Sequence, residues 1–304
     1  MNAPTTPPIS EAQNTERGQR FLRAQSRLYT EAKQIHDLRL ALVSIAALVT
    51  AVVAVCMPDA RAVVGAIGGI GLFAYSWLAS EREKRRRREA ASVQEEFDTF
   101  VFQLPWNDFA ADHVSPTLIA EAAARYRGDR TRDWYPDTAP VIRPLDVLIC
   151  QRSNLGWGAS IHRLWAALLS GILAALVLCV LLAAWLLDLN LAATITALVL
   201  PMLGPVRELG EMIQANRVSA DTKRQAETKV LSLWNRSMTD DYAATEKDCR
   251  AVQDKILAIR QANAHIPDRL DQLRRPQSEA AMQLSAQHLI EEATAHGQVS
   301  PNSE

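Results

Sequence analysis

The chain has 304 residues, and its 33 Lys and Arg nearly balance its 34 Asp and Glu, giving a formal net charge of −1. A chain this close to neutral has no bulk electrostatic reason to bind a DNA or RNA polymer. The charge is unevenly distributed, however, because long segments contain no charged residue. These segments decide the class of protein.

Four charge-free apolar runs are each long enough for an α-helix to cross about 30 Å of hydrocarbon. They are Leu40–Pro58, Ala62–Ser80, Leu164–Leu187 and Leu189–Val206. Buried helices of a soluble protein are the alternative, but four such runs in two close pairs do not fit it. The sequence therefore predicts an all-α membrane protein with two transmembrane helical hairpins, four spans in all, and an α-helical cytoplasmic module.

The distribution of Lys and Arg predicts the orientation. The short turns within the two pairs hold one of them, Arg61, whereas many flank the other ends of the spans. Positive loops stay cytoplasmic, so both termini and the middle segment are expected there. The expected parts are an N-terminal cytoplasmic amphipathic helix with a disordered start (1–38), hairpin 1 (39–80), a cytoplasmic middle module (81–163), hairpin 2 (164–206), and a cytoplasmic helical tail with a disordered end (207–304).

Two features within the predicted spans concern helix packing. Gly65 and Gly69 have the spacing that lets helix backbones approach closely, either within hairpin 1 or between subunits. Pro201 and Pro205 interrupt the backbone hydrogen bonds of span four. They predict a hinge there, and a helix end at the membrane interface is an equal alternative.

The cytoplasmic segments are expected to be helical with proline-marked ends. Pro105 should end the helix that continues span two, leaving Trp106 and Asn107 at its end. Ser115 and Pro116 should open a helix as its N-cap and first-turn proline. In the tail we expect helices over Glu208–Arg236 and Tyr242–Asn263, and a last short helix beyond Pro276.

No catalytic or metal-binding constellation is evident, so we expect neither enzymatic activity nor a cofactor or metal. The six histidines are scattered, and no phosphate-binding glycine loop occurs. Glu95, Glu96 and Asp98 form a carboxylate cluster that suits acid–base or metal chemistry. Helix-surface pairing with the arginines of the basic run Glu81–Glu89 is the favoured interpretation.

Several motifs resemble one family when taken together. They are Gln94-Glu-Glu-Phe-Asp-Thr-Phe-Val-Phe-Gln-Leu-Pro-Trp-Asn107, Arg132-Asp-Trp-Tyr-Pro136, Cys150-Gln-Arg-Ser-Asn154 and Ala24-Gln-Ser-Arg-Leu-Tyr-Thr-Glu-Ala-Lys33. Their order around two hairpins is similar to the SMODS-associating four-transmembrane effector family, over about Glu16 to Arg275. The chain departs from the family where Arg-Leu-Asp-Gln follows Ile266-Pro-Asp268 in place of an aromatic continuation.

The resemblance implies a pore-forming or membrane-disrupting effector of a CBASS-type anti-phage system. A partner nucleotidyltransferase would make a cyclic oligonucleotide on infection, and the effector, a homo-oligomer in the lipid bilayer of the bacterial inner membrane, would kill the cell. A non-conducting membrane adaptor or scaffold that recruits soluble partners is the alternative.

The candidate sensing or coupling residues all belong to these motifs. Trp106, Trp134 and Tyr135 are able to stack a base, and Arg152 and the arginines after span two suit phosphate. Core packing is the simpler role for each aromatic. Because Gln94–Asn107 follows span two through a charged helix, it is the predicted coupling element. The full candidate set is Asp98, Pro105, Trp106, Asn107, Trp134, Tyr135, Gln151, Arg152 and Asn154.

Overall fold

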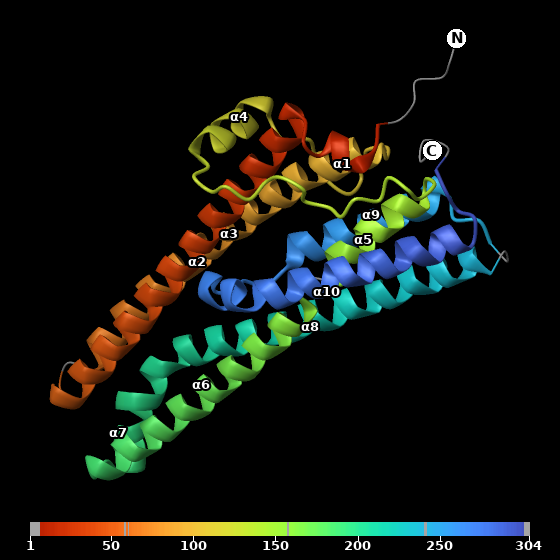
Figure 1. Cartoon of the computed structure of the whole chain (residues 1–304). Coiled ribbons are helices and arrows are strands. Elements are labelled where there is room, and N and C mark those ends of the chain that lie inside the picture. Colours follow the sequence, from red (N-terminus) through yellow and green to blue (C-terminus); the bar gives the residue numbers. More distant parts are fainter. Residues whose placement is uncertain (1–6, 58, 60, 157, 240–241, 301–304) are drawn as a thin grey trace. The chain divides into compact units, whose positions relative to one another are not determined.

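A computed structural model describes residues 7–57, 59, 61–156, 158–239 and 242–300, with the backbone alone over 61–73. The regular structure in these residues is helical, apart from one antiparallel bridge between Val141 and Val299 (Figure 1). The fold class expected from the sequence is all-α, and the described residues confirm it.

The chain divides into two compact units, which are described separately below. Unit 1 comprises residues 1–29, 87–162 and 218–304, and unit 2 comprises 30–86 and 163–217. The chain passes between them inside helices α2 (Glu16–Cys56), α3 (Arg61–Phe102), α6 (Ala159–Leu186) and α8 (Leu200–Met238).

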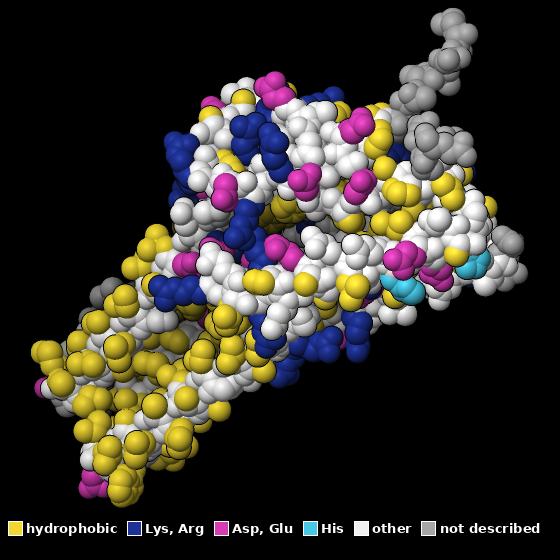
Figure 2. Space-filling model, viewed as in Figure 1, with side chains coloured by type: hydrophobic (Ala, Val, Ile, Leu, Met, Phe, Trp, Pro, Cys, Tyr) yellow, Lys and Arg dark blue, Asp and Glu magenta, His cyan; other side chains and the backbone are white. Residues whose placement is uncertain are grey.

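Unit 2 contains the apolar parts of these four helices together with α7 (Leu191–Thr194) and the π-helix η2 (Ile195–Val199). Three stretches of the described chain are long and apolar enough to cross a membrane: Glu16–Cys56, Leu145–Leu186 and Leu191–Met238. Many of their large side chains point outward, and Figure 2 shows hydrophobic surface gathered over this unit. Outward-facing Leu and Val suit lipid, because hydrocarbon accepts them without cost.

The predicted span two, Ala62–Ser80, remains a prediction. It falls in α3, where the structure describes the backbone over 61–73 but no side chains. Gly65 and Gly69 lie there, outside the residues whose packing is described. Their predicted close contact therefore remains a prediction too.

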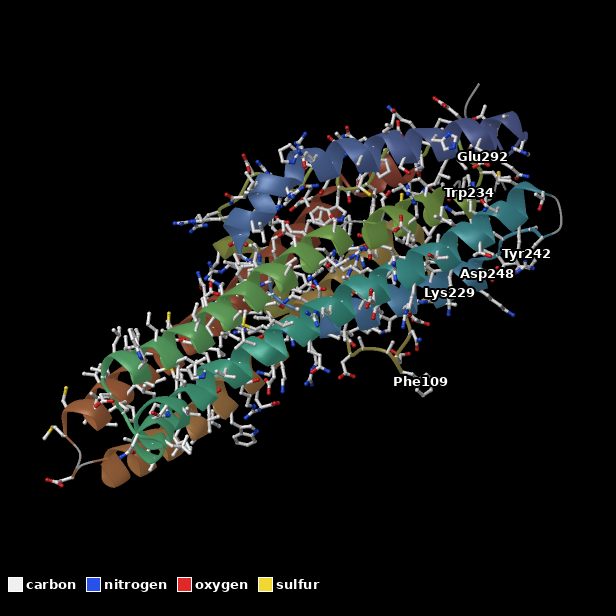
Figure 3. All side chains as sticks on the ribbon, turned by 90° about the horizontal axis from the view of Figure 1, so that it is seen from below. Phe109, Lys229, Trp234, Tyr242, Asp248 and Glu292 are labelled. Carbon is white, nitrogen blue, oxygen red and sulfur yellow. The ribbon has the colours of Figure 1, made fainter. Side chains whose placement is uncertain are left out.

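Unit 1 contains α1 (Ile9–Ala12), α4 (Pro116–Arg125), α5 (Leu145–Gly156), α9 (Glu246–Ala262) and α10 (Asp268–Ala295), with the polar ends of α2, α3 and α8. Its core includes Phe97, Phe102, Leu148 and Trp234, all fully buried. The Trp234 indole of α8 donates its Nε1 hydrogen to Glu292 Oε2 of α10 at 2.7 Å (Figure 3). A buried indole N–H needs such a partner, so this bond fixes the α8–α10 pairing.

Local sequence signals explain most helix ends in unit 1. The helix α3 ends at Phe102, and Gln103 has a left-handed φ of 56° just before Pro105. Pro116 opens α4 as expected, but Ser115, at the N-cap position, makes no side-chain capping bond. Thr245 caps α9 in a reciprocal capping box with Asp248.

Three expected helix limits in the tail are wrong, the first being the start of α9, which lies at Glu246 and not at Tyr242. The expected Glu208–Arg236 helix is part of α8, which runs through Pro205, and α10 runs through Pro276. An internal proline costs roughly 3 kcal/mol, and α10 has compensating packing, since Ala286, Leu289 and Ala293 beyond the proline are buried. Pro201 lies in the first turn of α8, directly after the π-helix η2. A hinge at Pro201 and Pro205 remains a prediction.

Candidate functional site

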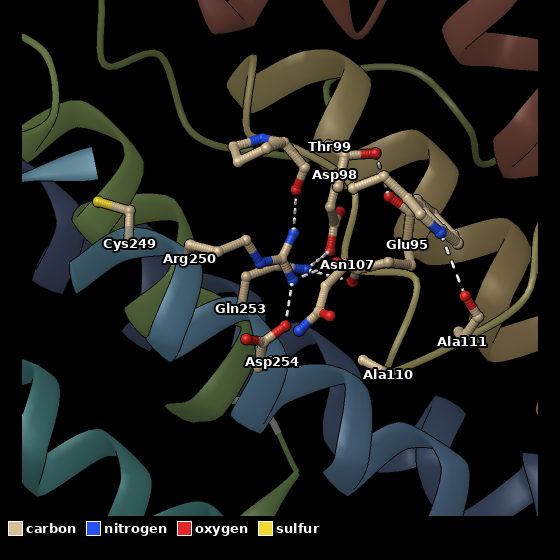
Figure 4. Close-up of polar contacts among 12 residues, drawn as sticks. Glu95, Asp98, Thr99, Asn107, Ala110, Ala111, Cys249, Arg250, Gln253 and Asp254 are labelled. Carbon is tan, nitrogen blue, oxygen red and sulfur yellow. Dashed lines mark hydrogen bonds and ion pairs between the residues drawn. The ribbon is translucent and has the colours of Figure 1, made fainter. Parts of the chain in front are cut away.

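The last turns of α3 place acidic side chains inside unit 1. Phe97 and Val101 are buried in the apolar core, while Glu95 and Asp98 are buried nearby. Buried carboxylates need ion pairs and hydrogen bonds, because desolvation of an unpaired charge is very unfavourable. Figure 4 shows that α9 presents Arg250 and Gln253 to this part of α3.

Asp98 is fully buried and accepts three strong hydrogen bonds. Arg260 Nη1 and Tyr135 Oη each donate to it at 2.6 Å, and Gln253 Nε2 donates at 2.7 Å. Asn154 Nδ2 donates to the same Tyr135 oxygen at 2.7 Å. Burial, and then the Asp98 charge, raises the pKa of Tyr135 well above its ordinary value, so this phenol stays a donor. Asp98 therefore joins three segments that are far apart in sequence.

Glu95 forms the second ion pair. Arg250 Nη2 donates to Glu95 Oε1 at 2.6 Å, and Gln253 Nε2 donates to Glu95 Oε2 at 2.8 Å. Burial raises the pKa of Glu95, as does the neighbouring Asp98 charge, while Arg250 opposes the rise. Arg250 Nη1 also donates to the Pro105 carbonyl at 3.0 Å. The turn at Pro105 is thus tied to the same ion pair.

Gln151 extends the network into α5. Its Nε2 donates to the Cys249 carbonyl at 2.8 Å and to Gln253 Oε1 at 3.1 Å. In the described part of the chain, Gln151 Oε1 and Arg260 Nη2 are buried with no hydrogen-bond partner. Unpaired buried polar atoms are expensive. Arg250 Nε is buried without a hydrogen-bond partner as well, so the described network retains one unused acceptor and two unused donors.

The expected pairing of these carboxylates with the basic run is wrong for Glu95 and Asp98. Both pair with arginines of α9, at positions more than 150 residues further along the chain. Arg88 lies seven residues before Glu95 in α3, and seven residues span about 10 Å of helix axis, beyond ion-pair reach. Glu96 pairs instead with His113 at 2.6 Å.

The aromatic candidates differ in accessibility. Tyr135 is buried and stacks on Phe97, with ring centroids 6.0 Å apart. Trp106 stacks on His113 at 4.1 Å and donates its Nε1 hydrogen to the Ala111 carbonyl at 3.1 Å. Trp134 is 38% exposed. Trp134 is therefore the most available of the three candidates for stacking against a ligand.

The remaining candidates have structural partners. Asn107 Oδ1 accepts the Phe109 backbone N–H at 3.1 Å and so shapes the turn after α3. Arg152 pairs with Glu227 of α8 at 3.2 Å and donates a hydrogen bond to the Ser285 hydroxyl of α10. Pro105, Gln151, Asn154, Tyr135 and Asp98 belong to one connected set, whereas Arg152 belongs to a separate contact.

Unit 2 holds a second buried charge cluster, which the sequence interpretation missed. Arg39 Nη1 donates to both carboxylate oxygens of Glu208 at 2.6 Å, and its Nη2 donates to Glu83 at 3.2 Å. His36 Nδ1 lies 3.3 Å from Glu83, and Ser76 donates to Glu208 at 3.0 Å. This cluster connects α2, α3 and α8. Arg39 directly precedes the first predicted span, and the sequence indicates only a topology role for it, because the end of a span explains a positive charge equally well.

Comparison with known proteins identifies the family. The family model of the SMODS-associating 4TM effector domain matches residues 7–289. A protein of Bacillus cereus (strain VD146) named "Probable CBASS effector molecule" is 27% identical over 171 residues, covering 52% of this chain and 57% of that protein. The chain thus matches little more than half the length of this relative. No solved structure matches significantly.

The extent of the family match decides the assignment. It covers nearly the whole described chain, and the three apolar stretches agree with a membrane location. The chain is a membrane protein that belongs to the SMODS-associating 4TM effector domain family.

Proposed function

We propose that this chain is the membrane-disrupting, pore-forming effector of a CBASS-type anti-phage system. A cyclic oligonucleotide from a partner nucleotidyltransferase triggers it from the cytoplasm, and the damaged membrane causes abortive infection. Family membership and the name of the Bacillus cereus relative support this role. The outward-facing apolar side chains of the three candidate spans support action within the bilayer.

The proposed topology has four spans in the bacterial inner membrane, with both termini and the middle segment in the cytoplasm. The support is the positive charge flanking one side of the spans. The proposed active form is a homo-oligomer, since the four apolar spans of one copy offer few polar side chains to line an aqueous path. The bilayer is the other required partner.

The single observation that carries the mechanism is the Glu95–Asp98–Arg250–Arg260 network. It closes α9 onto the end of α3, the helix that continues from hairpin 1. Phosphate is a strong ligand for arginine and competes with carboxylates. A ligand that draws Arg250 away also releases the Pro105 carbonyl. Ligand binding in unit 1 therefore frees the Gln94–Asn107 stretch, which is the proposed coupling element.

The test expresses the full chain in cells and compares cells that contain the cyclic oligonucleotide made by a nucleotidyltransferase with cells that lack it. Membrane potential and dye exclusion should collapse only when the cyclic oligonucleotide is present. Intact potential and dye exclusion with every cyclic oligonucleotide tried would refute the proposal.

Coupling is tested by Pro105→Ala and Trp106→Ala, which should keep ligand binding and lose leakage. Phe109→Ala is the matched control, because Phe109 lies on the same turn and its side chain is fully exposed (Figure 3). If Pro105→Ala and Trp106→Ala leak like the unmodified chain, the stretch is only core packing.

The alternative is a non-conducting membrane adaptor that recruits soluble partners. Unit 1, the larger of the two units, favours it by offering extensive polar surface. Dye-filled liposomes containing the purified chain discriminate between the two, since an adaptor releases no dye with any ligand.

No catalytic role is proposed for the carboxylate cluster. Glu95 and Asp98 are already bonded to arginine, and burial raises the pKa of the adjacent Cys249 thiol to about 12. A thiol with so high a pKa is a poor nucleophile. Alanine at Glu95, Glu96 and Asp98 together would revive an enzymatic role if activity vanished while fold, ligand binding and assembly persisted.

A further inference from the structure

The solvent-facing side of α10 bears an apolar stripe. Leu273 and Leu284 are 75% and 70% exposed, although both are large and hydrophobic. Pro276 and Ala280 are exposed between them. Spacings of three and four residues place all four on one helix face. Figure 2 shows separate hydrophobic patches along the exposed side of this helix.

The opposite face of α10 accounts for its attachment to unit 1. Ala286, Leu289 and Ala293 are buried there, about half a turn of the helix away from the stripe. The exposed leucines are therefore not needed to hold α10 in place. Two exposed leucines on one solvated helix face suggest a surface that another molecule covers.

The ends of the stripe carry opposite charges. Arg269 lies four residues before Leu273, and Glu291 lies seven residues after Leu284, both exposed and on the same helix face. Both are eleven residues from Ala280, one on each side. The two charged side chains thus lie at equal distances on either side of Ala280 and have opposite charges.

We propose that this face of α10 pairs with the same face of a second copy of the chain, antiparallel, with a two-fold axis near Ala280. A two-fold interface requires a self-complementary patch, in which each contact occurs twice. Arg269 of one copy meets Glu291 of the other at both ends. Leu284 of one copy packs against Pro276 of the other, since the two lie four residues on either side of Ala280, and the small Ala280 lets the helices approach closely.

The charges favour a second copy over a lipid surface. Over its whole length α10 carries five acidic side chains and three arginines, because Asp268 and Asp271 lie beside Arg269, Arg274 and Arg275 in its first turns. An anionic membrane therefore repels the helix as a whole. An antiparallel copy instead places the Glu291 of each helix beside the Arg269 of the other. The interface lies in unit 1 and does not depend on the proposed leakage activity.

Cysteine crosslinking tests the axis directly. In the full chain in detergent, with the exposed Cys56 and Cys179 changed to Ser, Ala280→Cys should form a covalent dimer rapidly under mild oxidation. Glu279→Cys is the control, since it is equally exposed but points about 100° around the helix. Equal crosslinking rates at the two positions would overturn the proposal.

Charge reversal tests the register. Arg269→Glu and Glu291→Arg should each raise the Kd of self-association roughly ten-fold, because each change affects two contacts per dimer. The double variant should restore the Kd, whereas Arg274→Glu, off the stripe, should leave it unchanged. Failure of the double variant to restore association would overturn the proposal. The proposal would also be overturned if Arg269→Glu changed only the binding of the chain to phosphatidylglycerol vesicles and left its self-association unchanged.

Discussion

Removal of the Asp98 carboxylate should destabilise the chain far more than removal of a typical surface charge. Asp98→Ala leaves the Arg260 guanidinium without its ion-pair partner, and the Arg260 side chain is only 11% exposed. Breaking a buried ion pair by removing one partner costs about 3–5 kcal/mol. The change should lower Tm by roughly 10 °C. Fluorescence-detected thermal unfolding of the full chain in detergent micelles measures this, with buried Trp234 as a reporter.

A paired substitution separates ion pairing from simple loss of packing. Asp98→Leu combined with Arg260→Met replaces both charges by apolar groups, which is often nearly neutral. Tyr135 and Gln253 then lack their Asp98 acceptor, which leaves a residual cost of about 1–3 kcal/mol. The double variant should therefore be more stable than Asp98→Ala, despite carrying one more substitution.

Asp254→Ala is the matched control. Asp254 is bonded to Arg250 at 2.9 Å, but its side chain is 34% exposed, so solvent screening limits its contribution to at most about 1 kcal/mol. If Asp98→Ala shifts Tm no more than Asp254→Ala does, Asp98 and Arg260 do not form a buried ion pair and the reasoning fails.

Three further predictions address pH, unit 2 and a helix cap. The raised pKa of Glu95 means that the folded chain holds this proton more tightly than the unfolded chain, so stability falls as pH rises above about 4.5. Glu95→Gln should remove this loss. The check is the change in unfolding midpoint between pH 4.5 and pH 7, and an equal fall in the unmodified chain and in the variant would contradict the prediction. Arg39→Met removes the buried arginine that pairs with both Glu83 and Glu208. This should cost about 3–5 kcal/mol in thermal unfolding, and an unchanged Tm would refute it. Thr245→Ala removes the capping box of α9 and should cost about 1 kcal/mol in denaturant unfolding, unless α9 is held entirely by its packed face.

Features set by a few neighbouring residues were predictable from the sequence. Pro105 and Pro116 mark the end of α3 and the start of α4, because proline restricts its own φ and lacks a donor. The helix expected to end at Asn263 does end there, since Asn263 is the C-cap of α9. Pro276 was misinterpreted because its cost is local, while the packing that offsets it lies further along the helix.

The partners in the buried network were not predictable in this way. From the sequence, Glu95 and Asp98 fit exposed charges on a helix surface as well as they fit buried ion-pair partners, since a helix face with several acidic residues is normally exposed. Arg250 and Arg260 lie in a tail segment to which no motif had been assigned. Pairing across more than 150 residues depends on how α9 packs, and no spacing within one helix reports that. The motifs contribute Asp98, Pro105 and Gln151 to the network, whereas its tail residues Arg250, Gln253 and Arg260 were not predicted.

The composition of this network bears on its role. A well-packed apolar contact between α3 and α9 would hold the helices at least as firmly, because a buried ion pair rarely adds net stability over apolar residues of similar size. Stability alone therefore does not explain two carboxylates, two arginines and a shared glutamine at this contact. A charged ligand has no group to replace in an apolar contact. In an ion pair, by contrast, phosphate is able to replace the carboxylate as the partner of the arginine, because it binds arginine at least as strongly. We infer that α9 is held to α3 by ion pairs because this contact has to separate in response to an anionic ligand.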